Sequence, residues 1–522
     1  MNKKSTDAAI IDIGSSEVKL IIAQTKDNRI EVLDHLVYPI NLGSEVFATG
    51  RASHNCVAEL VHAITGFSEL LSEYEITNYT AMATTALREA ANRSFIIDQI
   101  QVKTGIRVQV LEDNQEKLLI YHEMQSTMEE AGHDLPGRSL FLFTGSGTIG
   151  IAFLENGFIY DSMNIPLGSL KIQDMMKNIE SETDDYGSVL SEYLQSEFTY
   201  DKLPDDCVGI KNIVLTGSMI DLIADLTGAS RQENISTISV SALKELYSQI
   251  KNTRTEQIAI HFGIPESQAE LLYAALSIYV PLISFTNAKK ILSPKAEMGH
   301  CIMKRMLYPD AAESFLAYKR ANALACAKTT AYSCNCDTAH AEYVRNVAVQ
   351  VFDALTGLHG LGPHSRLLLE IASILHEAGH AISARNHLDA GFDFIRHTDL
   401  CGITKEDMLI VACIASVNEH IEPDMREERY RFMSDEMRSE TAKLIAIFRL
   451  ANSIDNTHTQ KIRKIKVRVE GNTLEIEGST SRNVFLEKWA LGLTASFFID
   501  VYALHPQLKI HSRLSVTLPK GE

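Results

Sequence analysis

The chain has 522 residues, several times the length of a typical domain, so a single-domain protein is excluded and several separate cores are expected. Hydrophobic residues make up 45% of the chain and charged residues 22%, which excludes a largely disordered protein. The formal net charge of -18 argues against broad nucleic-acid binding through phosphate neutralisation. A phosphate-rich ligand would therefore need a local site.

Membrane insertion and secretion are not expected. The longest uncharged apolar-rich run, residues 271–285, is interrupted by Pro281 and is shorter than the roughly 20 residues that a bilayer requires. The first residues lack the apolar core and cleavage site of a secretory signal. The eight cysteines show neither a disulfide framework nor zinc-site spacing. We expect a cytoplasmic protein with reduced, mostly buried thiols and no membrane contact.

The first part of the chain alternates short β-rich runs with helical patterns. We expect strands over residues 8–13, 18–23, 30–38, 79–83 and 108–111, and helices over residues 56–74, 87–104 and 115–128. The resulting order is β-β-β-α-β-α, which is typical of one α/β unit.

The same order begins again further along the chain. Strands are expected over residues 139–143, 148–153 and 158–165, and Glu155-Asn156-Gly157 is typical of the turn between the last two. Two copies of one α/β unit predict a cleft between the halves, with ligand-binding groups supplied by the hairpin turns at its mouth.

From about residue 309 the β-rich runs stop, and helical spacing dominates through residue 454. A hairpin is expected over residues 462–476, followed by a helix over residues 484–501. We therefore expect four domains: two α/β domains over residues 1–130 and 131–308, an all-helical domain over residues 309–460 and a small α/β piece over residues 461–522.

Basic residues alternate along the first strand of the predicted hairpin. Lys464, Lys466 and Arg468 lie on one face, which would suit a polyanion. Glu475 and Glu477 would neutralise them across the turn. We favour a solvated charged face over a binding strip.

Two similar glycine-containing turns follow buried strands, at residues 12–16 (Asp-Ile-Gly-Ser-Ser) and 145–148 (Gly-Ser-Gly-Thr). Such turns can direct backbone N–H groups and hydroxyls at a phosphate. An ordinary hairpin is the alternative for either turn taken alone, whereas a facing pair would form a phosphate clamp. The candidate phosphate-binding residues in the two turns are Asp12, Gly14, Ser15, Gly145, Ser146, Gly147 and Thr148.

Several segments resemble the exopolyphosphatase/guanosine pentaphosphate phosphohydrolase (Ppx/GppA) family. Besides the two turns, they are residues 83–92 (Ala-Thr-Thr-Ala-Leu-Arg-Glu-Ala-Ala-Asn), 110–121 (Val-Leu-Glu-Asp-Asn-Gln-Glu-Lys-Leu-Leu-Ile-Tyr) and 164–168 (Asn-Ile-Pro-Leu-Gly). The resemblance implies duplicated actin-like, ribonuclease H-like ATPase-type domains, and hydrolysis of a terminal phosphoanhydride. It also implies a homodimer.

By this resemblance Glu116 is the general base that orients the attacking water, and Arg88 reaches the phosphates. Bidentate anion contact suits a guanidinium. The alternatives are a capping box formed by Asp113 and Glu116, and a solvated helix arginine at position 88.

The chain also departs from the family pattern. The family has Asp-Ile-Gly-Gly-Gly-Ser-Thr-Glu where this chain has residues 143–150, so Phe143 and Gly150 replace two carboxylates that the resemblance links to Mg²⁺. Glu17 adds a negative charge near the expected phosphate, and Met298 takes the place of an arginine. Asp12 and Glu116 remain as candidate ligands for one ion, and the substrate is another source of Mg²⁺.

The helical region contains His376-Glu377-Ala378-Gly379-His380, which fits the H-E-x-x-H pattern of zinc metalloproteases. The preceding residues continue the Ppx/GppA resemblance, whose helical domain is of HD type, so we favour an HD-like domain. Its metal-site candidates are His340, His376 and Glu377, with Asn452 where an aspartate is expected. We favour a structural or dimerising platform over a second active site.

Two functions remain open at this point. The first is a phosphoanhydride hydrolase acting on the terminal phosphate of inorganic polyphosphate or guanosine pentaphosphate, with Mg²⁺ as the expected cofactor. The second is a sensor of the same fold that binds polyphosphate or a nucleotide without turnover. It is motivated by Phe143, Gly150 and Glu17.

Overall fold

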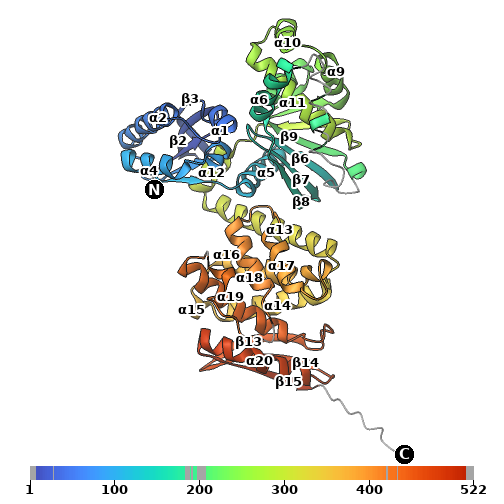
Figure 1. Cartoon of the computed structure of the whole chain (residues 1–522). Helices are drawn as coiled ribbons and strands as arrows, with labels where there is room; N and C mark the ends of the chain where they lie inside the picture. The colour runs from blue at the N-terminus through green and yellow to red at the C-terminus, as the bar shows by residue number, and fades with distance from the viewer. Residues whose placement is uncertain are drawn as a thin grey trace, which may run out of the picture. The chain divides into compact units, whose positions relative to one another are not determined.

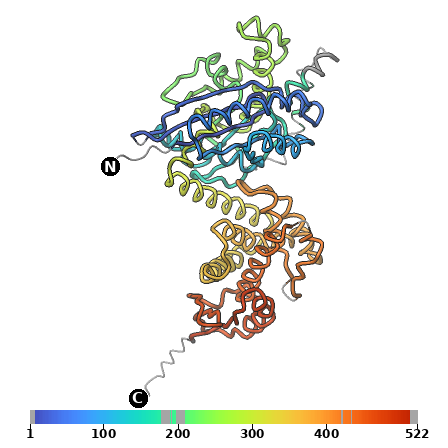
Figure 2. Tube along the Cα trace, turned by 90° about the vertical axis from the view of Figure 1, so that its left-hand side faces the viewer, coloured from blue at the N-terminus to red at the C-terminus, as the bar shows by residue number. Residues whose placement is uncertain are grey.

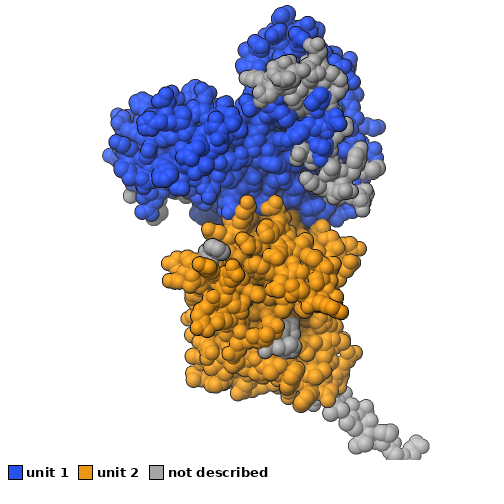
Figure 3. Space-filling model, viewed as in Figure 1, with its two compact units in different colours: residues 1–322 blue, residues 323–522 orange. Residues whose placement is uncertain are grey.

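The computed structural model describes residues 7–512 apart from residues 28, 183–188, 190–191, 195, 197–206, 419–420 and 432. The chain divides into two compact units, residues 1–322 and 323–522 (Figure 3). The division falls inside one helix, α13 (Pro309–Ser333). The four predicted domain boundaries remain predictions, although the two larger sheets lie in the two predicted α/β domains.

The first half of unit 1 is built on a five-stranded sheet in the order β3-β2-β1-β4-β5. Its elements are β1 (Asp7–Ile13), β2 (Glu17–Lys26), β3 (Arg29–Pro39), α1 (Leu42–Thr49), α2 (His54–Glu73), β4 (Tyr79–Ala83), α3 (Thr85–Glu89), α4 (Arg93–Thr104), β5 (Val108–Val110) and α5 (Asp113–Glu130). Strands β1 to β3 form a long antiparallel meander (Figure 2, dark blue). β1 is central and almost entirely buried, because its apolar residues face helices on both sides.

The second half of unit 1 has a seven-stranded sheet in the order β10-β11-β12-β9-β6-β7-β8 (Figure 1, teal to green). Its elements are β6 (Arg138–Thr144), β7 (Ile149–Glu155), β8 (Phe158–Ile165), α6 (Ser169–Glu182), η2 (Cys207–Gly209), β9 (Asn212–Gly217), α8 (Ile220–Leu226), β10 (Ser230–Gln232), β11 (Ile235–Ser239), α9 (Val240–Ile250), α10 (Thr255–Phe262), α11 (Glu266–Ser284), β12 (Lys290–Pro294) and α12 (Met298–Leu307). The predicted turn between β7 and β8 is present, with positive φ at Asn156 and Gly157.

The two halves repeat one topology. The order β3-β2-β1-β4-β5 corresponds to β8-β7-β6-β9-β12, with the same antiparallel and parallel pairings along each series. α12 crosses back and contacts β1, β2 and α5 of the first half. The mixed α/β fold and the duplication expected from the sequence are therefore present.

Unit 2 begins with helices and ends with a three-stranded sheet in the order β13-β14-β15. After α13 come α14 (Thr338–Ala354), α15 (Thr356–His359), α16 (Pro363–Leu375), η3 (Ala378–Ala381), α17 (His387–Arg396), α18 (Lys405–Ala415), η4 (Glu428–Tyr430), α19 (Asp435–Ser453), β13 (Arg463–Glu470), β14 (Thr473–Thr480), α20 (Phe485–Tyr502) and β15 (His505–Ser512). The helical region and the hairpin match the prediction. β15, which pairs parallel to β14, was not predicted.

One predicted helix is wrong in its extent. The single helix expected over residues 87–104 is two helices, α3 and α4, with a break at residues 90–92. The Asn92 side chain causes the break, because it accepts a hydrogen bond from the Ala52 amide and donates one to the Ala52 carbonyl.

The predicted apolar run forms most of α11, a helix of the second core that contains Pro281. Among the residues that the structure describes, no helix combines the length and the apolar character needed to cross a bilayer. Seven of the eight cysteine side chains are buried, as expected.

Candidate functional site

The two glycine-containing turns have equivalent backbone geometry. The Gly14 amide donates to the Glu17 carbonyl at 3.0 Å, and the Gly145 amide donates to the Thr148 carbonyl at 2.9 Å. The Gly43 amide of α1 donates to the Ser15 carbonyl, and the Leu170 amide of α6 donates in the same way to Ser146. Each turn is thus fixed by the first turn of the helix that follows its sheet meander.

The two turns meet. Ser146 Oγ donates a hydrogen bond to Ser15 Oγ at 2.6 Å, although the two residues are 131 positions apart. Ser15 is buried, whereas Ser16 next to it is exposed. The prediction from the sequence that the turns face each other agrees with this contact.

Asp12 lies near the end of β1, directly before the first turn, and pairs in register with Lys19 on β2. Burial raises the pKa of the Asp12 carboxyl to about 6, and Lys19 opposes this shift only in part. Its Oδ1 atom is buried and has no hydrogen-bond partner among the described residues. Asp12 is therefore a desolvated carboxyl whose charge is poorly compensated.

Glu17 does not leave an uncompensated charge beside the turn. Its carboxylate lies 2.7 Å from the Lys19 ammonium. Burial lowers the pKa of Lys19, but the hydrogen bond and charge of Glu17 outweigh it, and the net shift is upward. Lys19 was not expected from the sequence, although its position on the predicted second strand, beside Asp12 in a tight hairpin, was a usable signal.

Arg88 sits at the centre of a buried polar network at the start of α5. Its guanidinium donates to Asp113 Oδ1 at 2.5 Å, Glu116 Oε2 at 3.1 Å, Thr85 Oγ1 at 2.9 Å and the Leu111 carbonyl at 2.6 Å. Only 14% of its side chain is exposed. The solvated helix arginine considered from the sequence is therefore wrong, because four acceptors from two segments hold this guanidinium.

The capping box is also not where the sequence suggested. The residues that form it are Glu112, the N-cap of α5, and Gln115, whose Oε1 accepts from the Glu112 amide at 3.1 Å. Asp113 and Glu116 instead point at Arg88. Glu116 is thus available for a role other than capping.

Lys117 is buried within the same network and was not singled out from the sequence. Its ammonium donates to Asp113 Oδ1 at 3.0 Å and to Thr148 Oγ1 of the second turn at 2.8 Å. Only 2% of its side chain is exposed. A buried lysine is rare unless it is paired, and here Lys117 joins the Glu116 helix to the second turn.

The donor set at the second turn does not fit a bound Mg²⁺ ion. Mg²⁺ requires oxygen ligands, and neither Phe143 nor Gly150, which pair across β6 and β7, has a side-chain oxygen. The Lys117 stem fills the space above Gly150, where an added Cβ would lie 2.6 Å from Lys117 Cδ. Glu116 Oε2 is already bound to Arg88. Strands β6 and β7 therefore offer no carboxylate to hold an ion at this turn, and Lys117 occupies the space beside one of the two positions.

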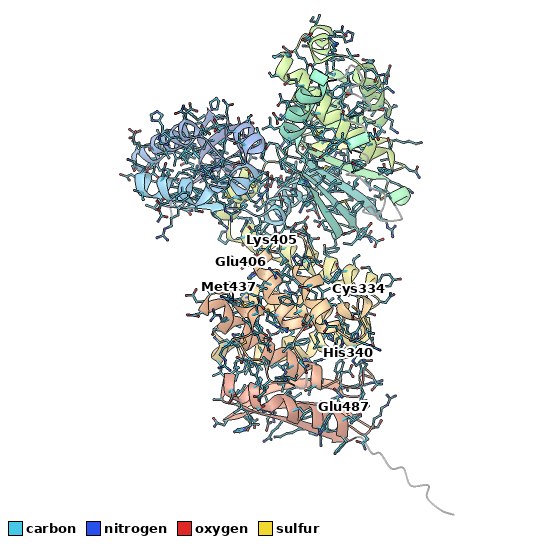
Figure 4. All side chains as sticks on the ribbon, in the orientation of Figure 1. Cys334, His340, Lys405, Glu406, Met437 and Glu487 are labelled. Atoms are coloured by element: carbon cyan, nitrogen blue, oxygen red, sulfur yellow. The ribbon has the colours of Figure 1, made fainter. Side chains whose placement is uncertain are left out.

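In unit 2 the structure brings the three predicted HD-like candidates together. Ligand atoms of His340, His376 and Glu377 all lie within 4.8 Å of one another. His340, labelled in Figure 4, is buried near the start of α14. Its ring nitrogens lie 2.9 Å from Asp455 Oδ2 and 3.0 Å from Asn452 Oδ1. The predicted Asn452 thus belongs to the cluster, and Asp455 joins it.

The structure lacks the geometry that H-E-x-x-H has in a zinc metalloprotease, the alternative that was not favoured from the sequence. His376 is the C-cap of α16, and His380 lies in the 3-10 helix η3, so the two do not share one α-helical face. The His380 ring instead stacks on His387 at 4.0 Å. Two histidines one turn apart on a continuous helix, which that pattern requires, are not formed.

The charged hairpin of unit 2 is neutralised at Arg468. Its guanidinium lies 2.9 Å from Glu475 and 3.0 Å from both Glu470 and Glu477. This arrangement supports the solvated charged face favoured from the sequence over a polyanion-binding strip.

Two family models match the chain, one in each compact unit. A model of the Ppx/GppA phosphatase family matches residues 21–296, more than half of the chain. The chain belongs to the Ppx/GppA phosphatase family. A model of Ppx/GppA phosphatase domain III also matches residues 325–494, which make up most of unit 2.

Relatives in this family are distant. The chain is 20% identical over 416 residues to a guanosine-5'-triphosphate,3'-diphosphate pyrophosphatase of Photobacterium profundum, covering 77% of this chain and 78% of that protein. It is also 20% identical over 423 residues to the protein of the same name from Vibrio parahaemolyticus, covering 78% and 79%. A solved Ppx/GppA family member from Aquifex aeolicus is 19% identical, with a TM-score of 0.49, 60% of this chain covered and 99% of that one.

Proposed function

We propose that unit 1 binds the terminal phosphate of inorganic polyphosphate or guanosine pentaphosphate where the two turns meet, and hydrolyses its phosphoanhydride. The observation that carries this proposal is the 2.8 Å hydrogen bond from Lys117 to Thr148, because it ties the helix bearing Glu116 to the second turn. The Ser15–Ser146 contact brings the first turn to the same place.

In this proposal Glu116 is the general base. Its Oε2 atom is fixed by Arg88, and Oε1 orients a water molecule toward the terminal phosphorus. The water oxygen forms a bond to phosphorus, the bond from phosphorus to the bridging oxygen breaks, and the water proton passes to Glu116. The products are inorganic phosphate and a chain or nucleotide shorter by one phosphate. Arg88 positions Glu116, and its direct contact with phosphate remains a proposal.

The second candidate is a sensor that binds the same ligand without turnover. The observation that favours it is the replacement of a carboxylate position by Gly150, whose space Lys117 fills. A catalytic metal ion can contribute several kcal/mol to the transition state, so its loss would cost orders of magnitude in rate.

Phosphate release and calorimetric binding separate the two candidates. Full-length wild type is compared with Glu116→Gln and with Glu129→Gln, an exposed glutamate on the same helix. The hydrolase predicts release of phosphate from tripolyphosphate or guanosine pentaphosphate, reduced about 100-fold or more by Glu116→Gln and unchanged by Glu129→Gln. Tight binding without release indicates the sensor. Neither binding nor release would reject both.

Unit 2 is proposed to act as a structural or dimerising platform. The support is that charged groups buried in it are paired within the unit, as with Glu487, whose Oε1 atom accepts from Lys461 at 2.9 Å and from Thr457 at 2.8 Å. A monomer by light scattering would reject the homodimer.

A further inference from the structure

We propose that the buried ammonium of Lys117 takes the place of a divalent cation, so that this chain binds its phosphoanhydride without a metal ion. The inference rests on the proposed function of unit 1. It goes beyond that function by assigning the cationic group that faces the ligand, and by predicting how binding responds to removal of metal ions.

Lys117 presents a fixed positive charge to the second turn. It follows Glu116 on α5, and its ammonium contacts the Thr148 hydroxyl at 2.8 Å. An ammonium has three N–H donors, and Asp113 and Thr148 account for two of them. We assign the third to a phosphate oxygen of the ligand, because lysine is a common phosphate-binding residue.

The charge of Lys117 is not cancelled by its acidic partner alone. Asp113 Oδ1 is shared between Lys117 and Arg88, at 3.0 Å and 2.5 Å. Glu116 brings a second carboxylate to Arg88. The two cations, Arg88 and Lys117, thus face two carboxylates, Asp113 and Glu116, and the four charges balance. What Lys117 offers a phosphate is thus the position of its ammonium beside Thr148, and not a surplus of positive charge.

Gly150 makes this arrangement possible. A Cβ atom at position 150 would lie 2.6 Å and 2.8 Å from Lys117 Cδ and Cε, and 2.5 Å from the Tyr121 hydroxyl. Real Cβ atoms essentially never approach other atoms so closely, so a side chain at position 150 would require Lys117 and Tyr121 to shift from their present positions. In this chain the space beside position 150 is taken by the lysine side chain, where the family pattern has a carboxylate.

The competing explanation is that Lys117 only stabilises α5 through its i,i+4 ion pair with Asp113. That explanation predicts a loss of stability in Lys117 variants with no change in ligand affinity. It also predicts no link between Lys117 and metal binding.

Calorimetric titration of the full chain with tripolyphosphate, in EDTA and in Mg²⁺, tests the proposal. We expect the affinity of the wild type to agree within about twofold between the two buffers, which is a negligible difference in binding free energy. Lys117→Met, which keeps the length of the side chain but removes its charge, should bind at least tenfold more weakly in both. The control Lys103→Met changes an exposed lysine and should bind like the wild type. A tenfold loss of wild-type affinity in EDTA, or wild-type affinity in Lys117→Met, would overturn the proposal.

A second measurement needs no phosphate ligand and separates failure of this inference from failure of the proposed function. Mn²⁺ binding is followed by electron paramagnetic resonance in a His376→Ala background, which disrupts the histidine cluster of unit 2. We expect no bound Mn²⁺ in that background alone, and bound Mn²⁺ after adding Lys117→Ala with Gly150→Glu. Equal binding with and without these two changes would overturn the inference. If tripolyphosphate does not bind but Mn²⁺ behaves as expected, the proposed function of unit 1 is rejected. The inference that Lys117 takes the place of a divalent cation is then retained.

Discussion

The hydroxyl oxygens of Ser15 and Ser146 lie 2.6 Å apart and join the two halves of unit 1 at their phosphate-loop candidates. A phosphate group placed between the two turns would have to separate these oxygens and replace the hydrogen bond that they share. The contact therefore stabilises the ligand-free fold, and a phosphate has to break it in order to bind between the turns.

Removing the hydrogen bond between Ser15 and Ser146 should lower the stability of the protein by a small, measurable amount. We expect Ser146→Ala to lower the free energy of unfolding by about 1 kcal/mol, because one partly buried hydrogen bond is lost. It should also change the affinity for tripolyphosphate, since a ligand-facing hydroxyl disappears. Ser16→Ala, at an exposed neighbour, should change stability by less than about 0.5 kcal/mol. Urea denaturation and calorimetry measure both effects, and identical behaviour of the two variants would contradict the role of Ser146.

Arg88 should be the most stability-sensitive residue of the candidate site. Arg88→Met leaves Glu116 and Asp113 without their shared guanidinium, and Glu116 is only 8% exposed. We expect a loss of about 3 kcal/mol, at the lower end for a broken buried ion pair because Asp113 is 35% exposed. Arg51→Met, at an exposed arginine, should stay within about 0.5 kcal/mol of the wild type in urea denaturation. A loss below about 1 kcal/mol for Arg88→Met would show that water replaces the guanidinium.

The strands β1 to β8 and the helices α2 and α5 of unit 1 follow from local patterns, because buried apolar runs and the Asn156-Gly157 turn report on neighbouring residues in the chain. The strands β9 to β12 were not predicted individually. β15 was missed, since its residues (His-Pro-Gln-Leu-Lys-Ile-His-Ser) carry little strand signal and its pairing with β14 spans a helix. The break before α4 was missed because it depends on Asn92 contacting Ala52, a residue far away in sequence.

The candidate site of unit 1 also contains some residues that could be predicted from local sequence and others that could not. Residues in turns, such as Ser15 and Ser146, could be predicted because each turn follows a buried strand. Lys117 could not, because a helical lysine is normally solvated, and its burial depends on the missing side chain at Gly150 in another strand. Arg88 was predicted from the resemblance, but its four acceptors are a property of the folded chain.

The raised pKa of Asp12 makes a pH-dependent prediction. The pKa of its carboxyl is about 6 in the folded chain and ordinarily 3.8, so the folded state keeps the proton that the unfolded state releases between these values. The stabilising contribution of the protonated form is complete below about pH 4 and is lost as the pH rises through about 6.

Asp12→Asn should therefore gain stability relative to the wild type as the pH rises from about 5 to about 8, because the amide does not ionise. Asp27→Asn changes an exposed aspartate, and its difference from the wild type should be the same at both pH values. Differential scanning calorimetry at these two pH values measures the differences. A pH-independent difference for Asp12→Asn would show that Asp12 is ionised throughout.

The histidine cluster of unit 2 gives the last prediction. One feature favours a metal ion: His376 Nδ1 donates to the Ser373 carbonyl, and burial lowers the pKa of this histidine to about 3, which leaves a neutral Nε2 for coordination. Other features oppose it. Both ring nitrogens of His340 are hydrogen-bonded, and Glu377 Oε2 accepts from the Asp337 amide at 2.8 Å.

Because a metal ion would have to displace these partners, we expect the unfolding temperature of the full chain to be the same with Mn²⁺ or Zn²⁺ as with EDTA. If an ion does bind here, its presence at a concentration of about one hundred times its Kd would add about 2.7 kcal/mol to the free energy of unfolding. The midpoint of thermal unfolding would then rise by several degrees. A rise of that size that disappears in His376→Ala would establish a metal site here, and the paired residues of the cluster would then be its ligands in a rearranged state.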